Sequence, residues 1–372
     1  MECKITAYKS IEDCKEAWKQ NININNSLEI DALRVFEKAK PTGFTFEYLL
    51  IKEKSNEEVI ACCYLQHIII GPNQLSIHTN YLLNFLIKIL LFIKPFKVIY
   101  CGNLFKAECC GFTAFGNLSE KNIIDLVKSW YKKHTYDLLL FKNLKPDLIT
   151  ALANGKEAIA FDQDLTMKLQ IKNEWQSLND YITSLSKKYK KRAEKILCSN
   201  ENLQYKQLSI EEIRINSKRI EYLFDQIVEK QQIKLGRVDI KYFLACQEYL
   251  GNKFKFMAIY AKAEMVGFYT TLSYLDEHEI HFVGIDQLAN LQYQIYFNIL
   301  FKGLEEAILS KQKFLELGRT AREAKAILGA KPIRSLDLLF PKNLRTKFVL
   351  QKATAAFNET QGAIWQSRNP FK

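Results

Sequence analysis

The sequence predicts an α/β (α+β) protein of two similar domains in tandem, each with a mixed central sheet flanked by helices. The chain has 372 residues, of which 48% are hydrophobic. A chain of this length is longer than a single hydrophobic core usually spans. The order hairpin, strand, helix, strand also occurs twice along the chain, which is typical of a tandem duplication. We therefore expect domains at residues 1–150 and 160–372, connected through residues 143–161.

Each element of this expected duplication rests on a local pattern. In the first half, apolar runs predict a strand pair and a third strand, a Gly-Asn pair breaks the chain, and a helix and a strand follow. These lie at 46–52, 59–70, 97–101, 102–103, 120–133 and 136–141. The second half repeats the order after a first strand at 165–171, with the elements at 254–261, 265–275, 279–285, 293–310 and 314–317.

Cysteine spacing and the apolar runs indicate the compartment. The nine cysteines contain no C-x-x-C pair, and this favours buried thiols in a reducing cell. The N-terminal residues have no apolar segment of the kind found in signal peptides. The longest apolar run, 81–93, contains Asn84 and Lys88 and is too short to span a bilayer. We expect a soluble, cytoplasmic protein.

The net charge of +12 is unevenly placed, and the segment SKKYKKRAEK at 186–195 concentrates basic residues. Apolar residues at spacings of three and four between 178 and 196 predict a helix with one docked face and one cationic face. Lys188 and Arg192 lie in this segment. The cationic face either binds a polyanion, such as tRNA, a coenzyme phosphate or a membrane surface, or is simply solvated.

Ionisable residues follow the carboxyl ends of two expected strands that a crossover helix joins. Parallel strands of this kind leave a crevice at their carboxyl ends, where ligands commonly bind. The candidate site residues there are Asp286, Glu316, Arg319, Arg322 and Lys325.

Each candidate has a structural alternative. Asp286 is either an active-site carboxylate or the N-cap of the next helix. Glu316 either faces the crevice or pairs with Arg319. Arg319 and Lys325 either clamp an anion or form surface salt bridges. Tyr269, on the preceding strand pair, either presents its hydroxyl to the crevice or packs in the core.

Four segments resemble one protein family. They are CGN at 101–103 with GF at 111–112, the segment 175–192, HFVGID at 281–286, and ELGRTAREAKAILGAKP at 316–332. Together they are similar to the GNAT superfamily of N-acyltransferases, and within it to the two-domain FemAB-like or BioF2-like relatives of the Fem peptidoglycan-bridge aminoacyltransferases. The last segment is the most specific of the four.

The resemblance implies direct transfer of an acyl or aminoacyl group from an activated donor to an amine. The implied donor is acyl-coenzyme A, an acyl-carrier protein or an aminoacyl-tRNA, held between splayed strands, and the implied acceptor is a small-molecule, lipid or peptidoglycan-precursor amine. No tightly bound cofactor is expected, and no metal, because His278 and His281 would face opposite sides of a strand.

Residue roles follow from the same resemblance. Asp286, Glu316 and Tyr269 would be catalytic, and the basic residues Arg319, Arg322, Lys325, Lys188 and Arg192 would bind substrates. Donor phosphates would meet a helix N-terminus near Gln287 and Asn290. This segment departs from the superfamily's phosphate loop because residues 286–292 contain no glycine.

Asn103 lies in the equivalent crevice of the first domain. This domain would complete an acceptor groove or serve as a scaffold. The alternative function is a non-catalytic binding protein that holds an anionic polymer or a membrane through its basic helix.

Overall fold

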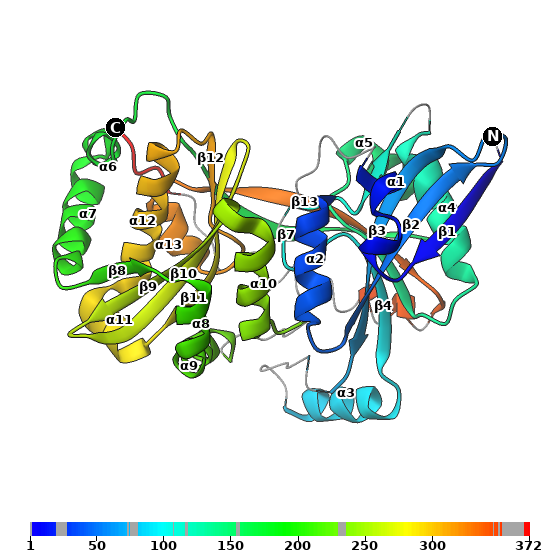
Figure 1. Ribbon diagram of the computed structural model, residues 1–372, viewed down its shortest axis with the longest axis horizontal. Coiled ribbons are helices and arrows are strands. Elements are labelled where there is room, and N and C mark those ends of the chain that lie inside the picture. The colour runs from blue at the N-terminus through cyan, green and yellow to red at the C-terminus, as the bar shows by residue number, and fades with distance from the viewer. Residues whose placement is uncertain are drawn as a thin grey trace. The chain divides into compact units, whose positions relative to one another are not determined.

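The computed structural model describes residues 2–19, 28–72, 74, 81–106, 108–115, 118–153, 157–229, 236–344, 346–348, 350–351 and 368–372. The chain forms two compact units that exchange segments along the sequence. Unit 1 contains residues 1–164, 232–238 and 334–363, and unit 2 contains 165–231, 239–333 and 364–372. Strands β7 (Ile159–Gln170) and β13 (Lys331–Pro341) each run from one unit into the other. Figure 1 shows helices and strands in both units.

Unit 1 contains a mixed sheet with the strand order β1-β2-β3-β4-β6-β13, and β5 pairs with β3 off this path. All neighbours are antiparallel except β4 and β6, which are parallel. Residues 60–68 of β3 are all buried, as expected of a strand that is covered on both faces. The strands before β7 are β1 (Cys3–Tyr8), β2 (Phe44–Glu53), β3 (Val59–Ile70), β4 (Phe96–Cys101), β5 (Phe112–Ala114) and β6 (Leu138–Phe141).

Two helices of unit 1, α2 and α4, are strongly amphipathic. In α4, Ser119 caps the N-terminus by accepting from the Asn122 N–H, and Ile123, Ile124 and Val127 are buried against the sheet. The apolar run of α3 instead carries exposed side chains. The helices are α1 (Lys15–Lys19), α2 (Ile30–Ala39), α3 (Tyr81–Ile93), α4 (Glu120–Lys132) and α5 (Pro146–Ala153), with a 3-10 turn at Ile11–Asp13.

Unit 2 contains mixed β-sheet with the strand order β7-β12-β11-β10-β9-β8. Its neighbours are antiparallel except β11 and β12, which are parallel. A crossover through α11 and α12 joins this parallel pair. The strands after β7 are β8 (Gln204–Gln207), β9 (Phe254–Ala261), β10 (Glu264–Tyr274), β11 (Glu277–Ile285) and β12 (Phe314–Glu316).

Helices cover both faces of the unit 2 strands (Figure 1). On one face, α12 packs on β11 and in turn carries α6 and α7, around a core that includes Ile280, Leu304 and Leu315. On the other face, α9 and α10 pack over an aromatic cluster that includes Phe243 and Phe268. The helices are α6 (Leu178–Ser184), α7 (Lys187–Asn200), α8 (Ile210–Ile215), α9 (Ser217–Val228), α10 (Ile240–Leu250), α11 (Gln287–Tyr293), α12 (Ile295–Leu309) and α13 (Arg322–Ile327), with a 3-10 turn at Gly251–Lys253.

The predicted fold class is confirmed, and two predicted helices need correction. The helix expected at 293–310 begins at Ile295, because Gln294 adopts a left-handed conformation (φ 50°), and the preceding loop is the separate helix α11. The helical segment expected over 178–196 is two helices, because Leu185 is extended and Ser186 precedes a new N-terminus. None of the helices in the described ranges is long and apolar enough to cross a membrane.

Candidate active site

The parallel pair of unit 2, β11 and β12, has a short ladder. It joins residues 277–279 of β11 to Phe314–Glu316 of β12. Strand β12 ends there, whereas β11 continues to Ile285 alongside β10. A register shift between Tyr269 and Thr271 bends the β10–β11 ladder just beyond this level. Within the described chain, the β12 side of β11 therefore has no strand pairing beyond Glu279.

Glu316 lies at the end of this short ladder, in a row of buried charged residues. It is aligned with Glu279 of β11 on one side and with Lys168 of β7 on the other. Leu315 and Leu317 pack in the core beneath α12, so the side chain of Glu316 points to the opposite face. Glu316, Glu279 and Lys168 are all buried, and the Lys168 ammonium lies 3.1 Å from a Glu277 carboxylate oxygen. The cation offsets the repulsion between neighbouring carboxylates.

Lys325 brings a second buried cation to Glu316. Its side chain is 2% exposed, and its ammonium lies beside the turn at Gly318, 3.8 Å from where a Cβ on that glycine would be. Burial lowers the pKa of Lys325 to about 7, the Glu316 carboxylate acts in the opposite direction, and Arg322 lowers the pKa further. An amine with this pKa exchanges its proton near neutral pH, as a general acid or base must.

A chain of hydrogen bonds extends from Glu279 on the same face of the sheet. The Glu279 carboxylate accepts from Nδ1 of His281 at 2.6 Å, and Nε2 of His281 lies 2.7 Å from the Tyr242 hydroxyl on α10. Because an ionised carboxylate can only accept, Nδ1 of His281 carries a proton, and Nε2 shares the second hydrogen bond with the Tyr242 hydroxyl. Burial raises the pKa of Tyr242 well above its ordinary value. This arrangement holds a carboxylate, an imidazole and a phenol in a fixed order.

Asp286 lies at the far end of β11 and caps α11. Its carboxylate accepts from the N–H groups of Leu288 and Ala289 at 3.1 Å and lies 3.7 Å from Arg219. At about 3.3 Å per residue, the seven residues from Glu279 place Asp286 roughly 20 Å along the strand. The structure therefore does not bring Asp286 together with Glu316, and the geometry supports the capping role.

Gln287 and Asn290 both lie on α11. The Asn290 side chain accepts from the Tyr296 N–H at 2.9 Å, which satisfies one of the unpaired donors at the start of α12. Gln287 is the first residue of α11. Both are near Asp286 rather than near Glu316.

Tyr269 lies on the α12 face of the sheet. Its hydroxyl donates to the Glu306 carboxylate at 2.8 Å, and the side chain is buried in the core cluster. Burial and the Glu306 charge raise the pKa of Tyr269. On this face His278 lies between Ser273 and Glu306, so His278 and His281 face different helices. Tyr269 and Glu316 therefore lie on opposite faces.

Arg319 and Arg322 lie in the turn that connects β12 to Lys325. The Arg322 guanidinium donates to the Arg319 carbonyl at 3.2 Å, and Ala321 between them has a positive φ of 50°. The turn therefore places Arg319 and Arg322 with Lys325, three basic side chains in one short stretch after Glu316.

The remaining predicted residues lie elsewhere. Asn103 belongs to unit 1, where its buried side chain accepts from Gln66 at 3.3 Å and from the Phe105 N–H at 2.9 Å. Lys188 and Arg192 are exposed on α7, and Arg192 stacks on the Phe297 ring at 5.1 Å. Because α7 packs on α12, these two residues lie on the face away from Glu316.

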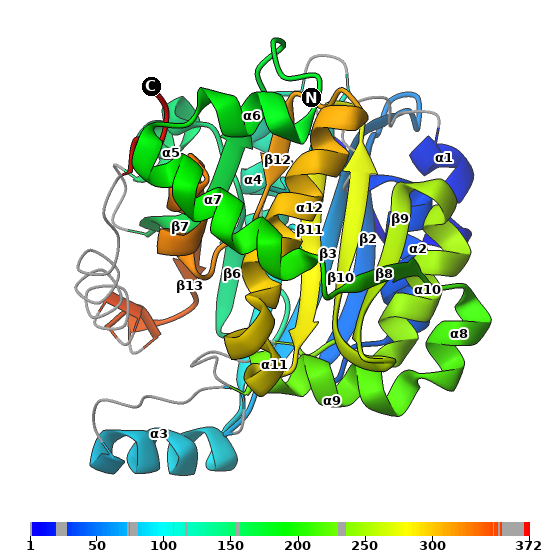
Figure 2. The ribbon, with the colours of Figure 1, turned by 90° about the vertical axis from the view of Figure 1, so that its left-hand side faces the viewer.

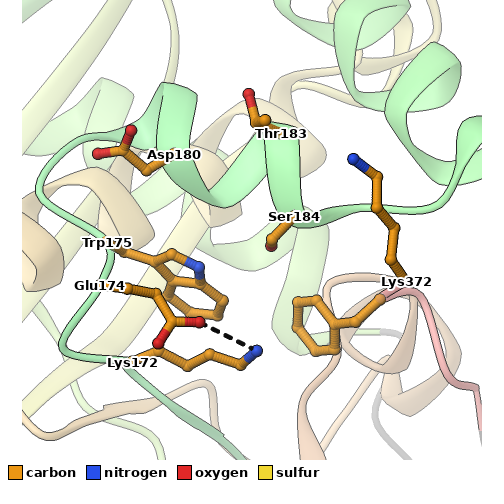
Figure 3. A pocket seen from close by; sticks show the side chains of 8 residues that line it. Lys172, Glu174, Trp175, Asp180, Thr183, Ser184 and Lys372 are labelled. Carbon is orange, nitrogen blue, oxygen red and sulfur yellow. Dashed lines mark hydrogen bonds and ion pairs between the residues drawn. The ribbon is translucent and has the colours of Figure 1, made fainter.

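A surface hollow of about 360 Å³ lies at α6 and the end of the chain (Figure 3). Lys172 approaches the rings of Trp175 and Phe371 at 5.5 and 5.2 Å and pairs with Glu174 at 3.4 Å. None of its lining residues is a predicted site residue, and the ion pair and rings partly fill it.

Sequence reasoning missed four members of the buried face: Lys168, Glu279, His281 as a hydrogen-bonding residue, and Tyr242. Glu279 and His281 alternate with apolar residues on one strand, and this two-residue period is a signal that could have placed them together. Tyr242 is 39 residues away from His281 in sequence, and no local pattern links them.

Comparisons with known proteins identify the fold. No family model matches the sequence, and no curated protein matches it at a significant level. Solved structures do match. FemX has a TM-score of 0.52 at 9% identity, over 95% of this chain and 100% of that chain. L-PGS from Bacillus licheniformis has a TM-score of 0.52 at 12% identity, over 95% and 97%. A tandem GNAT protein from the clavulanic acid biosynthesis pathway has 0.51 at 9%, over 92% and 99%. The chain thus has the tandem GNAT fold of FemX-type proteins.

Proposed function

We propose that this protein is an N-acyltransferase that moves an acyl or aminoacyl group from an activated donor to an amine. The observation that carries the proposal is the buried Lys325–Glu316 pair at the point where the β11–β12 ladder ends. The fold shared with FemX and a tandem GNAT protein supports the reaction class. The proposed site lies wholly within unit 2.

The chemistry requires a group that accepts one proton. The neutral amine of the acceptor attacks the donor carbonyl carbon, a C–N bond forms, and the carbonyl oxygen takes the charge. Neutral Lys325 takes the proton from the attacking nitrogen as the C–S or C–O bond to the leaving group breaks, and Lys325 then returns that proton to the leaving group. Glu316 stabilises the lysine while it is charged. No covalent enzyme intermediate is needed.

The basic turn and the α11 region are proposed to hold the donor. Arg319 and Arg322 offer guanidinium groups for a phosphate or carboxylate. Gln287 and Asn290, roughly 20 Å from Glu316 by strand length, would contact the distal part of an elongated donor. Acyl-coenzyme A, an acyl-carrier protein and an aminoacyl-tRNA all meet this requirement, with a small-molecule, lipid or peptidoglycan-precursor amine as acceptor.

The test is product formation with a panel of these three donor classes and simple amines, followed by mass spectrometry. Lys325→Met and Glu316→Gln should reduce turnover with the active donor by roughly two to four orders of magnitude. Lys331→Met, an exposed lysine on β13, is the matched control and should retain activity. If the wild type forms product and both site variants turn over as fast as the wild type, the chemistry lies elsewhere.

The exposed face of α7 supports a second candidate, the binding of an anionic polymer. Lys187, Lys188, Lys191 and Lys195 are exposed, and within the described ranges no salt bridge involves them. Salt-sensitive binding of tRNA or a polyphosphate, with no product from any donor, would favour this candidate over the transferase.

A further inference from the structure

Helix α3 exposes large apolar side chains to solvent. Phe85, Leu90, Phe92 and Ile93 are 53%, 65%, 79% and 73% exposed. Helix α3 follows β3 and precedes β4 in the chain, and Figure 2 shows it away from the other helices of unit 1. Among the described elements, none packs closely against it. An exposed apolar surface of this kind marks an interaction site.

The apolar surface covers a wide part of the helix. At 100° per residue, Phe85, Ile89, Phe92 and Ile93 fall within an arc of about 100°, and Leu90 extends it by about 60°. Phe85, Ile89 and Phe92 have the i, i+4, i+7 spacing that a groove-docking helix also presents. Leu90, which is 65% exposed, lies outside that stripe, and a continuous apolar medium would cover it together with the stripe.

The length and charge of α3 specify that medium. Thirteen residues give a helix about 20 Å long, shorter than the roughly 30 Å of a hydrocarbon core. The helix contains no acidic residue, and Lys88 lies on it. Lys94 and Lys97 follow it directly and are exposed, and the Lys94 ammonium lies 3.7 Å from an Asp137 carboxylate oxygen. A short apolar helix with flanking lysines matches the interface of a bilayer that contains anionic lipids.

The exposed apolar surface continues beyond the helix. Ile69, at the end of β3, is 49% exposed and is aligned with Lys97 of β4. The two strands next to α3 in the chain therefore add one exposed apolar side chain and one exposed basic side chain. The helix carries the same combination of apolar and basic side chains.

We propose that α3 is a membrane-docking helix, which lies in the interface of an anionic bilayer and buries its phenylalanine, leucine and isoleucine side chains among the acyl chains. The lysines at and after α3 contact the lipid phosphates. The proposal rests on unit 1 alone and does not depend on the transferase activity.

The experiment measures binding of the full chain to vesicles by co-sedimentation. The vesicles are phosphatidylcholine alone or phosphatidylcholine mixed with phosphatidylglycerol. The α3 variant is Phe85→Ser with Phe92→Ser. The matched control removes two exposed apolar side chains from unit 2, Leu275→Ser with Leu309→Ser, which are 85% and 66% exposed in the wild type.

We expect the wild type to bind the mixed vesicles more strongly than phosphatidylcholine alone. The α3 variant should lose roughly tenfold or more of this affinity, because two buried rings are removed, and the control should lose none. The emission of a Phe92→Trp chain should shift further to the blue on mixed vesicles than on phosphatidylcholine alone. Circular dichroism checks that every variant is folded.

Three outcomes would overturn the proposal. One is that the wild type binds neither type of vesicle. Another is that the α3 variant binds as tightly as the wild type. The third is self-association of the wild type that rises with concentration in sedimentation velocity and is lost in the α3 variant, while vesicle binding is unchanged. That result would mean that α3 docks on a second copy of the chain.

Discussion

Replacing Lys325 by methionine should change how the stability of the protein depends on pH. The pKa of Lys325 is about 7 in the folded chain, against an ordinary value of 10.5. Between these two values the unfolded chain holds more of this proton than the folded chain does, so the unfolding free energy of the wild type rises with pH. Below pH 7 both states are protonated, and the contribution no longer changes.

The magnitude follows from the same two values. The full slope is about 1.4 kcal/mol per pH unit, and because the lysine is half-titrated at pH 7, the rise from pH 7 to 9 is about 2 kcal/mol. Lys325→Met lacks this proton, whereas all other titrating groups are present in both proteins. The difference in unfolding free energy, wild type minus variant, should therefore increase by about 2 kcal/mol over this range.

The assay is urea denaturation of the wild type and of Lys325→Met at pH 7, 8 and 9. Lys331→Met, at an exposed position, is the control and should give a difference that does not depend on pH. A flat or falling difference for Lys325→Met would refute the reasoning, since it would mean that the lysine keeps an ordinary pKa in the folded chain. A base with this pKa in the transferase would also give kcat/KM a rise centred near pH 7.

Three further predictions address other predicted residues. Asp286→Ala should lower the unfolding free energy by about 0.5–2 kcal/mol, because two capped N–H groups lose their acceptor; unchanged urea midpoints would argue against the cap. Arg319→Ala should raise the Michaelis constant for donor or acceptor by roughly ten- to a hundredfold with little change in kcat, and a loss confined to kcat would contradict an anion clamp. Reversing Lys187, Lys188 and Lys191 on α7 to glutamate should weaken association with an anionic donor in a salt-dependent manner, while turnover at saturating donor stays close to wild type. A collapse of turnover at constant affinity would show that α7 takes part in the chemistry.

The strands could be predicted closely because each depends on its own hydrophobic run. Strand β9 has the predicted bounds, and β10 and β11 differ from the prediction by one or two residues at their ends. The break at Gln294 could not be predicted, because this residue has a positive φ although neither glycine nor proline marks the position. The break before α7 could have been predicted from Ser186, because serine is a favoured N-cap residue. The apolar spacing of three and four continues across this position and favoured a single helix instead.

The domain boundaries at 1–150 and 160–372 stay a prediction, and the structure shows why sequence alone does not define the units. Residues 334–341 of β13 belong to unit 1, where residues 338–341 pair with β6. An apolar run predicts that a strand forms but not which sheet it joins. Sheet register likewise aligned Lys168 with Glu316, although no local pattern relates positions so far apart in sequence.

The buried charges argue for function because stability alone would not favour them. Apolar residues of similar volume often stabilise a protein more than a buried ion pair does, whereas removal of one partner leaves an unpaired charge. The double variant Lys325→Met with Glu316→Gln removes both charges at once. We expect its urea midpoint at pH 7 to equal or exceed that of the wild type, and its turnover to fall by at least two orders of magnitude. A stable and fully active double variant would reduce the pair to a feature of the scaffold. A stable and inactive one would show that the charges are retained for chemistry, at a cost in stability that the fold tolerates.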